Sequence, residues 1–204
     1  MIDNSEFPTM KQLLILPFLL LTLLVAYPAF PADFHKGMDA FEKGDYATAL
    51  KIWEPIAKEG DTSAQFQLGN MYTNGHGVTI DHKTAYKWYL LAARQGYAAA
   101  ESSVGFAYRR GLGVKRDRKV SIEWYTAAAE KGFTPAQIGL GIMHTTGGRA
   151  KRNNTAAYMW WSIAAMLGDK EAMKLQKMIA ERMNPGQINE AKRLAHTWVK
   201  EHGG

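Results

Sequence analysis

Apolar and small residues follow a helical period through the middle of the chain. Ala64, Leu68 and Tyr72 recur at a spacing of four, which places them on one face of a helix. Gly75 can end this helix in a left-handed cap, and Asp81 can cap the start of the next one. The pattern predicts a helix–turn–helix unit. The residues expected on one side of its second helix are Ala85, Trp88, Tyr89 and Ala92.

The same unit returns every 36 residues without a gap, so the chain compared with itself shows which positions are constrained. One unit of this kind cannot bury its own apolar face, so we expect neighbouring units to stack into a continuous core. The columns that keep this step are Gly69, Gly105 and Gly141; Gly60, Gly96, Gly132 and Gly168; Ala64, Ala100, Ala136 and Ala172; Trp88, Trp124 and Trp160; and the Ala pairs 92/93, 128/129 and 164/165.

The glycine inside each first helix needs a packing reason, because Gly in a helix costs about 1 kcal/mol relative to Ala. We expect a Cβ at Gly69, Gly105 or Gly141 to collide with the facing helix. We further expect the tryptophan of the same unit to cover the glycine. The periodic tryptophans are then core residues and not a carbohydrate or peptide platform.

The ends of the chain differ from the middle, as the terminal units of a repeat array do. Residues 33–62 predict an N-terminal capping helix pair, with helices over 34–42 and 46–58 and with Trp53 one place beyond the repeat tryptophan. Residues 63–168 hold three complete repeats. Residues 169–204 predict C-terminal capping helices, one over 170–183 with Lys177 in place of the helix glycine, and one from Pro185 to about Lys200.

The repeat reads Ala-x-x-x-Leu-Gly-x-x-Tyr, then Gly-x-Gly-Val, then Asp-x-x-x-Ala-x-x-Trp-x-x-x-Ala-Ala-x-x-Gly. This motif resembles the Sel-one-like repeat family, a relative of the tetratricopeptide repeat. The resemblance implies an all-α fold, an α/α superhelical solenoid of 36-residue helix-turn-helix repeats, and a role as an assembly platform or a regulator of envelope signalling. The third unit departs from the motif at residues 147–150, at His144 in place of Tyr and at Asn153 in place of Asp.

The first 32 residues differ in character from the rest. Lys11 precedes an apolar run from Leu13 to Ala26, and a segment with small residues follows as far as Ala32. A positive charge, an apolar stretch of about 14 residues and a small-residue exit are typical of a secretory signal peptide. We therefore predict that residues 1–32 are removed on export to a bacterial periplasm or to the medium. An uncleaved membrane anchor is the alternative, although a spanning helix needs roughly 20 apolar residues, and a buried helix is the remaining interpretation.

The 204 residues carry a net charge of +6 and no cysteine. The lack of cysteine excludes disulfides, thiolate nucleophiles and cysteine-ligated zinc. The charge is uneven: residues 33–80 hold 4 Lys/Arg against 7 Asp/Glu, a net of −3, whereas residues 81–204 hold 20 against 10, a net of +10. The basic part is either ordinary solvated surface or a face for an anionic partner. The export signal argues against nucleic acid.

No constellation of residues predicts catalysis or a cofactor. The chain lacks Ser-x-x-Lys, Gly-x-Ser-x-Gly and His-Glu-x-x-His motifs. His76 and His82 flank one loop but have no convincing third metal ligand, and the glycine pairs 75/77 and 111/113 recur with the repeat, as turn residues do. We expect neither an enzyme nor a metal or cofactor protein. A β-lactam or peptidoglycan hydrolase, an activity proposed for cysteine-rich relatives of the family it resembles, is the least favoured hypothesis.

Function is expected at surface positions, because the repeat already explains the scaffold positions. Opposite the core of the first helices, one column carries Asn70, Phe106 and Ile142, which are three different chemistries at one repeat position. We define the concave strip as Asn70, Asn74, Phe106, Arg110 and Ile142, and predict that it binds a segment of another protein. Neighbouring candidates are Phe66, Gln67, Ser102, Ser103, Ile138, Gly139 and Thr146. For Phe66 and Ile138, packing against the preceding unit is an equal alternative, because stacked helices bury two faces.

A second candidate surface is the densest group of basic residues on the chain. We define the basic patch as Arg109, Lys115, Arg116, Arg118 and Lys119. An anionic envelope polymer or a membrane surface would bind there. An adaptor for an unidentified protein partner is the leading hypothesis, because buried aromatic anchors dominate protein interfaces whereas rim charges mainly change the association rate.

Overall fold

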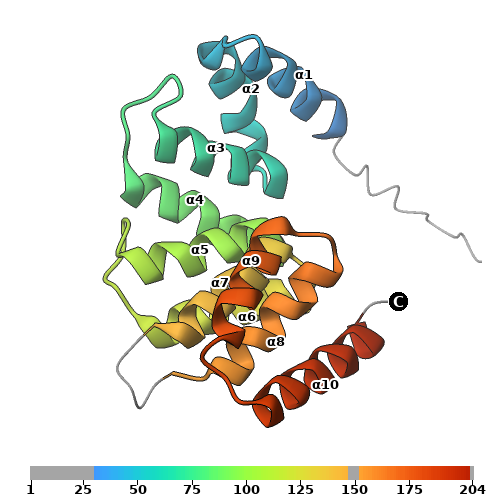
Figure 1. Cartoon of the computed structure of the whole chain (residues 1–204). Coiled ribbons are helices and arrows are strands. Elements are labelled where there is room, and N and C mark those ends of the chain that lie inside the picture. Colours follow the sequence, from blue (N-terminus) through green and yellow to red (C-terminus); the bar gives the residue numbers. More distant parts are fainter. Residues whose placement is uncertain (1–29, 147–151, 203–204) are drawn as a thin grey trace, which may run out of the picture.

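The computed structural model describes residues 30–146 and 152–202. Within these ranges every regular element is an α-helix and no strand occurs (Figure 1), which confirms the predicted all-α fold. The helices are α1 (Phe30–Glu42), α2 (Tyr46–Lys58), α3 (Thr62–Asn74), α4 (His82–Arg94), α5 (Ala98–Arg110), α6 (Arg118–Glu130), α7 (Thr134–Thr145), α8 (Asn154–Met166), α9 (Lys170–Ala180) and α10 (Pro185–His202).

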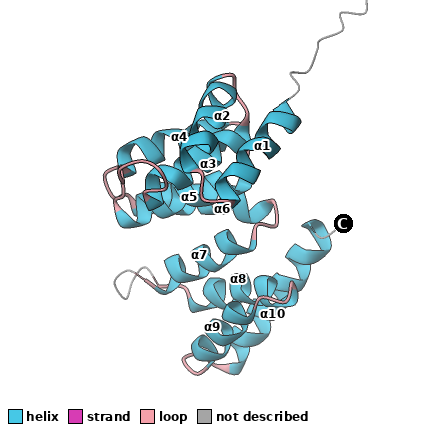
Figure 2. Ribbon diagram, turned by 90° about the horizontal axis from the view of Figure 1, so that it is seen from above, coloured by secondary structure: helices cyan, strands magenta, loops and turns pink. Residues whose placement is uncertain are grey.

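From α1 to α9 each helix packs against the next one along the chain, so that helix pairs stack in sequence order (Figures 1 and 2). The three repeat pairs are α3–α4, α5–α6 and α7–α8, and the pair α1–α2 is stacked before them. Contacts also join α5 to α7, so the first helices of these successive units lie side by side. This arrangement is the α/α solenoid that the 36-residue period predicts.

The turn between the two helices of a repeat closes in a recurring way. Gly75 ends α3 at a φ of 76°, a left-handed conformation that glycine adopts without strain. Asp81 then caps α4, and its backbone N–H donates to the carbonyl of Tyr72 at 3.0 Å. In the third repeat the side chain of Asn153 caps α8, and its N–H donates to the carbonyl of His144 at 2.9 Å. The predicted departure from the motif at 147–150 falls in the middle of that turn, and residues 147–151 lie outside the described residues.

Each helix glycine lies under an aromatic ring, but the ring is not the tryptophan that we predicted. A Cβ at Gly69 would lie 2.9 Å from Cζ of Tyr89, and a Cβ at Gly105 would lie 3.0 Å from Cγ of Tyr125. The predicted assignment is wrong because successive residues on a helix point about 100° apart. Only one of two neighbours can face the first helix, and it is the residue after the tryptophan. The third pair of this kind is Gly141 with Trp161.

The repeat tryptophans instead contact the preceding unit. Trp88 packs against the core formed by α1, α2 and α3, and Trp124 packs against the core of α4 and α5. Both side chains are half-buried, whereas Trp160 is buried. The tryptophan column therefore joins units to one another, and the tyrosine column that follows it closes each unit internally.

The α1–α2 pair follows the same design with a different spacing. Trp53 occupies the column of the covering rings, and its Nε1 donates to the carbonyl of Phe34 at 3.2 Å. Trp161 repeats this contact with the carbonyl of Ile138, also at 3.2 Å. Helix α1 begins at Phe30, four residues before the start that we expected. Residues 1–29 of the predicted signal peptide lie outside the described residues.

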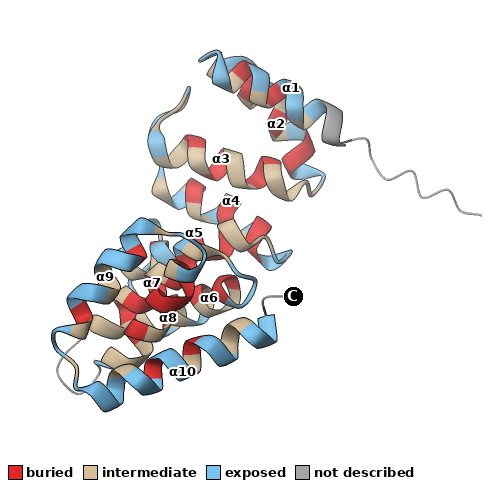
Figure 3. Ribbon diagram, turned by 45° about the vertical axis from the view of Figure 1, so that its right-hand side comes forward, coloured by how far each residue is buried: buried red, intermediate tan, exposed pale blue. Residues whose placement is uncertain are grey.

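At the other end, α10 closes the array by lying against α8 (Figure 3). It buries Ala191 and Ala195, and it places the ring of Trp198 at 5.9 Å from that of Trp160. Helix α9 ends at Ala180, three residues before its predicted end. Because α10 packs on α8 and does not form a second helix over α9, position 177 of α9 stays exposed, and a lysine replaces the repeat glycine there.

Candidate functional site

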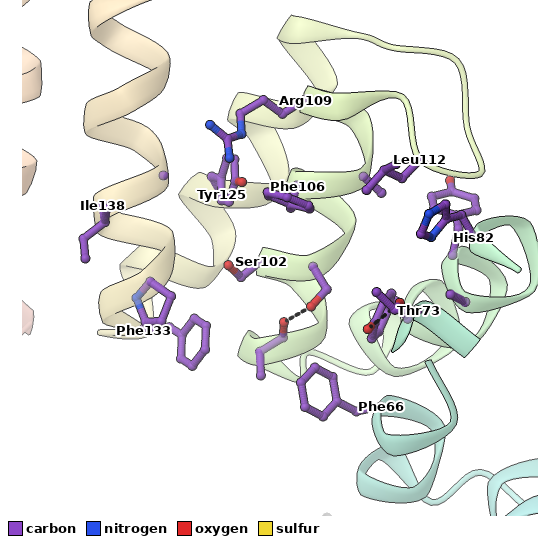
Figure 4. Close-up of a pocket in the computed structure, with 18 of the residues that line it drawn as sticks. Phe66, Thr73, His82, Ser102, Phe106, Arg109, Leu112, Tyr125, Phe133 and Ile138 are labelled. Carbon is purple, nitrogen blue, oxygen red and sulfur yellow. Dashed lines mark hydrogen bonds between the residues drawn. The ribbon is translucent and has the colours of Figure 1, made fainter. Parts of the chain in front are cut away.

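A pocket of about 410 Å³ lies among the first helices α3, α5 and α7, with α5 across its middle (Figure 4). Three successive repeats contribute to its wall, and most of the lining side chains are apolar. Tyrosines of the second helices α4 and α6 reach into it between the first helices. Its lining includes Phe66, Ser103, Phe106, Arg109, Tyr125 and Phe133.

Phe106 projects from α5 into the centre of the pocket and keeps 40% of its surface exposed. The stacking of the repeats does not require an aromatic group here, since the same column carries Asn70 and Ile142. One helical turn later, the guanidinium carbon of Arg109 lies 5.0 Å from the centre of the Phe106 ring, in a cation–π contact. The accessible aromatic ring at the centre of the pocket thus lies next to a cation toward one end of it.

Tyr125 reaches the pocket from α6 by passing between two glycines. A Cβ on Gly105 of α5 would lie 3.0 Å from Cγ of this ring, and a Cβ on Gly139 of α7 would lie 2.7 Å from Cε1. The earlier repeats carry Gln or Ser at the position of Gly139, so this glycine is specific to the third repeat. The missing side chain lets the ring approach α7, and the Tyr125 hydroxyl lies beside the Arg109 guanidinium (Figure 4).

The electrostatic character of the pocket is positive. Among the described residues that line it, Arg109 is the only Lys or Arg, and no Asp or Glu is present. The Nε of Arg109 is buried without a hydrogen-bond partner, and no ion pair within 4.0 Å joins Arg109 to an acid of the described residues. Burial raises the pKa of Tyr125, and the Arg109 charge lowers it by less. The Tyr125 hydroxyl therefore stays protonated at neutral pH and can donate a hydrogen bond.

The opposite wall comes from the first repeat. The ring of Phe66 lies 5.7 Å from that of Tyr89. The Tyr89 hydroxyl donates to Oδ1 of Asn70 at 2.8 Å and lies 3.0 Å from the hydroxyl of Thr73. Burial raises the pKa of Tyr89, so its hydroxyl is also neutral. Asn70 and Thr73 fix the orientation of a ring that lines the pocket.

The structure divides the concave strip into two groups. Phe106 and Ile142 line the pocket. Asn70 is half-buried and holds Tyr89, whereas Asn74 and Arg110 are exposed and lie outside the lining. Of the neighbouring candidates, the pocket includes Phe66, Ser102, Ser103, Ile138 and Gly139.

The basic patch is divided in the same way. Its member Arg109 lines the pocket. Arg118 turns toward the end of α7, where its guanidinium donates to the carbonyl of Met143 and, at 3.3 Å, to the hydroxyl of Thr146. Burial and, second, the Arg118 charge lower the pKa of His144. The exposed members are Lys115, Arg116 and Lys119, the last of them 3.9 Å from a carboxylate oxygen of Glu123.

Phe133 is a pocket residue that our sequence analysis did not identify, although a signal was present. It stands at the N-cap of α7 and makes no capping hydrogen bond. The same repeat position holds Asp61 before α3, Tyr97 before α5 and Asp169 before α9. Both carboxylates cap their helices, whereas Tyr97, like Phe133, makes no capping hydrogen bond. Losing such a cap costs about 0.5 to 2 kcal/mol. An aromatic residue therefore replaces the capping group before both α5 and α7, and of these two only Phe133 lines the pocket.

Other kinds of site find no support in the ranges 30–146 and 152–202. No three His, Asp or Glu side chains there lie close enough together to hold a metal ion. No helix in these ranges combines the length and the apolar character needed to cross a bilayer. His76 stacks on Tyr46 with ring centroids 4.9 Å apart, so it packs the first repeat turn against α2. His82 lines the pocket from the start of α4.

The fold defines a helical-repeat scaffold of the kind that binds protein partners. Three consecutive segments of the sequence, residues 62–97, 98–133 and 134–169, match the family described as Sel1 repeat. Since these segments cover more than half of the chain, this protein belongs to the Sel1 repeat family. The resemblance inferred from the repeat motif is confirmed.

Two solved structures share the fold. The Sel1 repeat protein from Oxalobacter formigenes is similar with a TM-score of 0.67 at 25% sequence identity, over 82% of this chain and 70% of that one. The second is c5321, described as a protective antigen present in uropathogenic Escherichia coli strains that displays an SLR fold, with a TM-score of 0.58 at 22% identity. That match covers 84% of this chain but 46% of c5321. No curated protein sequence matches this chain.

Proposed function

We propose that this protein is an exported adaptor that holds a segment of a partner protein in the pocket around Phe106. The observation that carries the proposal is Phe106 itself, an aromatic side chain 40% exposed inside a pocket built by three repeats. Aromatic anchors that become fully buried on association usually supply most of the binding energy of an interface. The scaffold gives no reason for an exposed phenylalanine at this column, whereas binding does.

The test is a matched pair of truncations combined with photo-crosslinking. A benzoylphenylalanine in place of Phe133, which exchanges one aromatic group of the pocket wall for another, should crosslink to the partner in the native compartment, and mass spectrometry then identifies it. Leu91 on α4 is the control for Phe106, since it is 44% exposed and lies outside the pocket lining. Phe106→Ala should weaken binding of the identified partner about 30-fold, equivalent to about 2 kcal/mol. Leu91→Ala should leave it unchanged, and circular dichroism should show both variants folded.

Two results would contradict the pocket as the partner site. Equal weakening by Phe106→Ala and Leu91→Ala would mean that binding follows general surface hydrophobicity. Loss of capture on Arg116→Glu together with full capture by Phe106→Ala would move the function to the basic patch. The ligand would then be an anionic envelope polymer or a membrane surface.

Export is the second part of the proposal, and it rests on the charge, length and exit pattern of residues 1–32. The mass of the native protein should correspond to a chain that begins near Asp33. A membrane-embedded form that begins at Met1, or at Met10 if translation starts there, would instead favour an uncleaved anchor.

A further inference from the structure

The pocket is not uniform along its length. Arg109 and the Tyr125 hydroxyl lie at one end, Phe106 lies in the middle, and Phe133 and Phe66 lie toward the other end (Figure 4). The single cation therefore stands at the edge of an otherwise neutral and largely apolar cavity. A ligand that complements the charge and polarity of this pocket must carry an anionic group at one end and apolar groups next to it.

The Arg109 guanidinium can bind an anionic group, and the described part of the chain places no acidic side chain beside it. A guanidinium has five N–H donors and pairs best with a carboxylate in a two-pronged geometry. No acid of the described residues is within 4.0 Å of Arg109, and its Nε is buried without a partner. The neutral hydroxyl of Tyr125 beside it offers one more donor. These groups together match one carboxylate.

The anion and an apolar group of the ligand must also be neighbours. The guanidinium carbon of Arg109 lies 5.0 Å from the centre of the Phe106 ring, so a carboxylate bound to Arg109 lies directly beside an apolar surface. The last residue of a polypeptide carries its carboxylate and its side chain on the same carbon atom. An internal Asp or Glu instead brings a peptide group on either side of it. Those groups need hydrogen bonds, and the backbone groups of the α5 and α7 walls are already paired within their helices.

We propose that the pocket recognises the C-terminal residue of its partner, with the free α-carboxylate at Arg109 and Tyr125 and an apolar side chain against Phe106. The inference rests on the proposed function, since it names the chemistry of the segment that the adaptor holds. The volume agrees, because about 410 Å³ is at the small end of the range of about 300 to 1,000 Å³ for ligand pockets. It accommodates one or two residues.

The experiment uses a fluorescein-labelled hexapeptide library with C-terminal phenylalanine and randomised preceding positions, made once with a free carboxylate and once as the carboxamide. Fluorescence anisotropy with the mature protein should show at least tenfold tighter binding of the free acid. Arg109→Gln should reduce binding of the free acid to the level of the carboxamide. Arg94→Gln is the matched control, because it removes an equal charge from an exposed residue at the end of α4 that belongs neither to the pocket lining nor to the concave strip or the basic patch, and it should leave binding unchanged.

Three outcomes would overturn the inference. They are equal binding of acid and carboxamide, equal loss in the Arg109 and Arg94 variants, and no binding of the free acid up to millimolar concentration. An amidated library with one internal glutamate distinguishes a side-chain carboxylate from a chain terminus, and binding of that library as tight as the free acid would also overturn it. If the partner found by crosslinking depends on Phe106 while acid and carboxamide bind equally, the adaptor function stands and only this inference fails.

Discussion

Two arginines on neighbouring helices use their charge in opposite ways. Arg118, at the start of α6, donates to the Met143 carbonyl and to the Thr146 hydroxyl, so it ties the second repeat to the third. Arg109, at the end of α5, has a buried Nε without a partner and lies against an exposed aromatic ring. Both belong to the densest basic stretch of the chain. The number of charges in a stretch therefore does not show which of them are used in contacts between repeats, whereas the structure does.

The regions around these two arginines also differ in how well they obey local rules. At the start of α6, Asp117 caps the helix through the backbone N–H groups of Lys119 and Val120. At the pocket, Phe133 leaves α7 without a side-chain cap, as Tyr97 does at the start of α5, and Gly139 stands where the earlier repeats carry a side chain. Natural proteins usually break local rules at functional positions. The comparison therefore favours the pocket over the basic loop as the site of recognition.

The largest expected effect tests whether two positions of α5 have different roles, Gly105 in helix packing and Ser103 in the pocket wall. Gly105→Leu must push Tyr125 and the Ser121 carbonyl away from α5, and overpacking of this kind costs about 1 to 3 kcal/mol. Ser103→Leu points into the pocket, so it should leave the free energy of unfolding nearly unchanged while it blocks peptide binding. Chemical denaturation of both variants decides this. Equal losses would mean that Gly105 is not held at a helix contact.

A smaller effect tests the structural role of Arg118. Arg118→Ala removes a charged donor from the Met143 carbonyl and from Thr146, and we expect a loss of about 1 to 2 kcal/mol in the free energy of unfolding. Arg116 is exposed, so Arg116→Ala should change it by less than about 0.5 kcal/mol. Urea denaturation of the two variants measures both. Similar small losses of unfolding free energy in both variants would mean that Arg118 is an ordinary surface charge and does not stabilise the contact between repeats.

The smallest effect is a pH dependence at His144. Burial and the Arg118 charge lower its pKa from 6.5, so the unfolded chain binds a proton more readily than the folded one. The contribution to stability is therefore present above pH 6.5 and is lost as the pH falls through the lowered folded pKa. We expect a loss of less than about 1 kcal/mol between pH 7.5 and 5.5. His144→Tyr, which restores the repeat tyrosine, should lack this loss, and an identical pH dependence in the variant would contradict the assignment.

Much of the fold was readable from the sequence, because a repeat displays its own constraints. The 36-residue step predicted the helix pairs, and Gly75 and Asp81 marked a turn that the structure closes as expected. The helix glycines correctly indicated a close contact. Their partner was misassigned, because Trp88 and Tyr89 are neighbours and the period is the same for both columns. Only the direction of each side chain distinguishes a contact within a unit from one between units.

The candidate site was readable in part. The variable column drew attention to Phe106 and Ile142, and the aromatic at a capping position could have drawn attention to Phe133. Whether Arg109 or Arg110 faces the pocket was not readable, since both are basic and adjacent.

What the sequence by itself determined is the periodic part of this protein: the class of fold, the units, their turns and the positions released from the repeat. Periodicity is a property of the amino-acid sequence, so it can be recognised before the structure is known. Only the tertiary structure decided that Nε of Arg109 is buried without a hydrogen-bond partner among the described residues, that Tyr125 passes between Gly105 and Gly139, and that three repeats line one pocket. Each of these depends on the distance between side chains from different helices, which packing sets and which no spacing along the chain records.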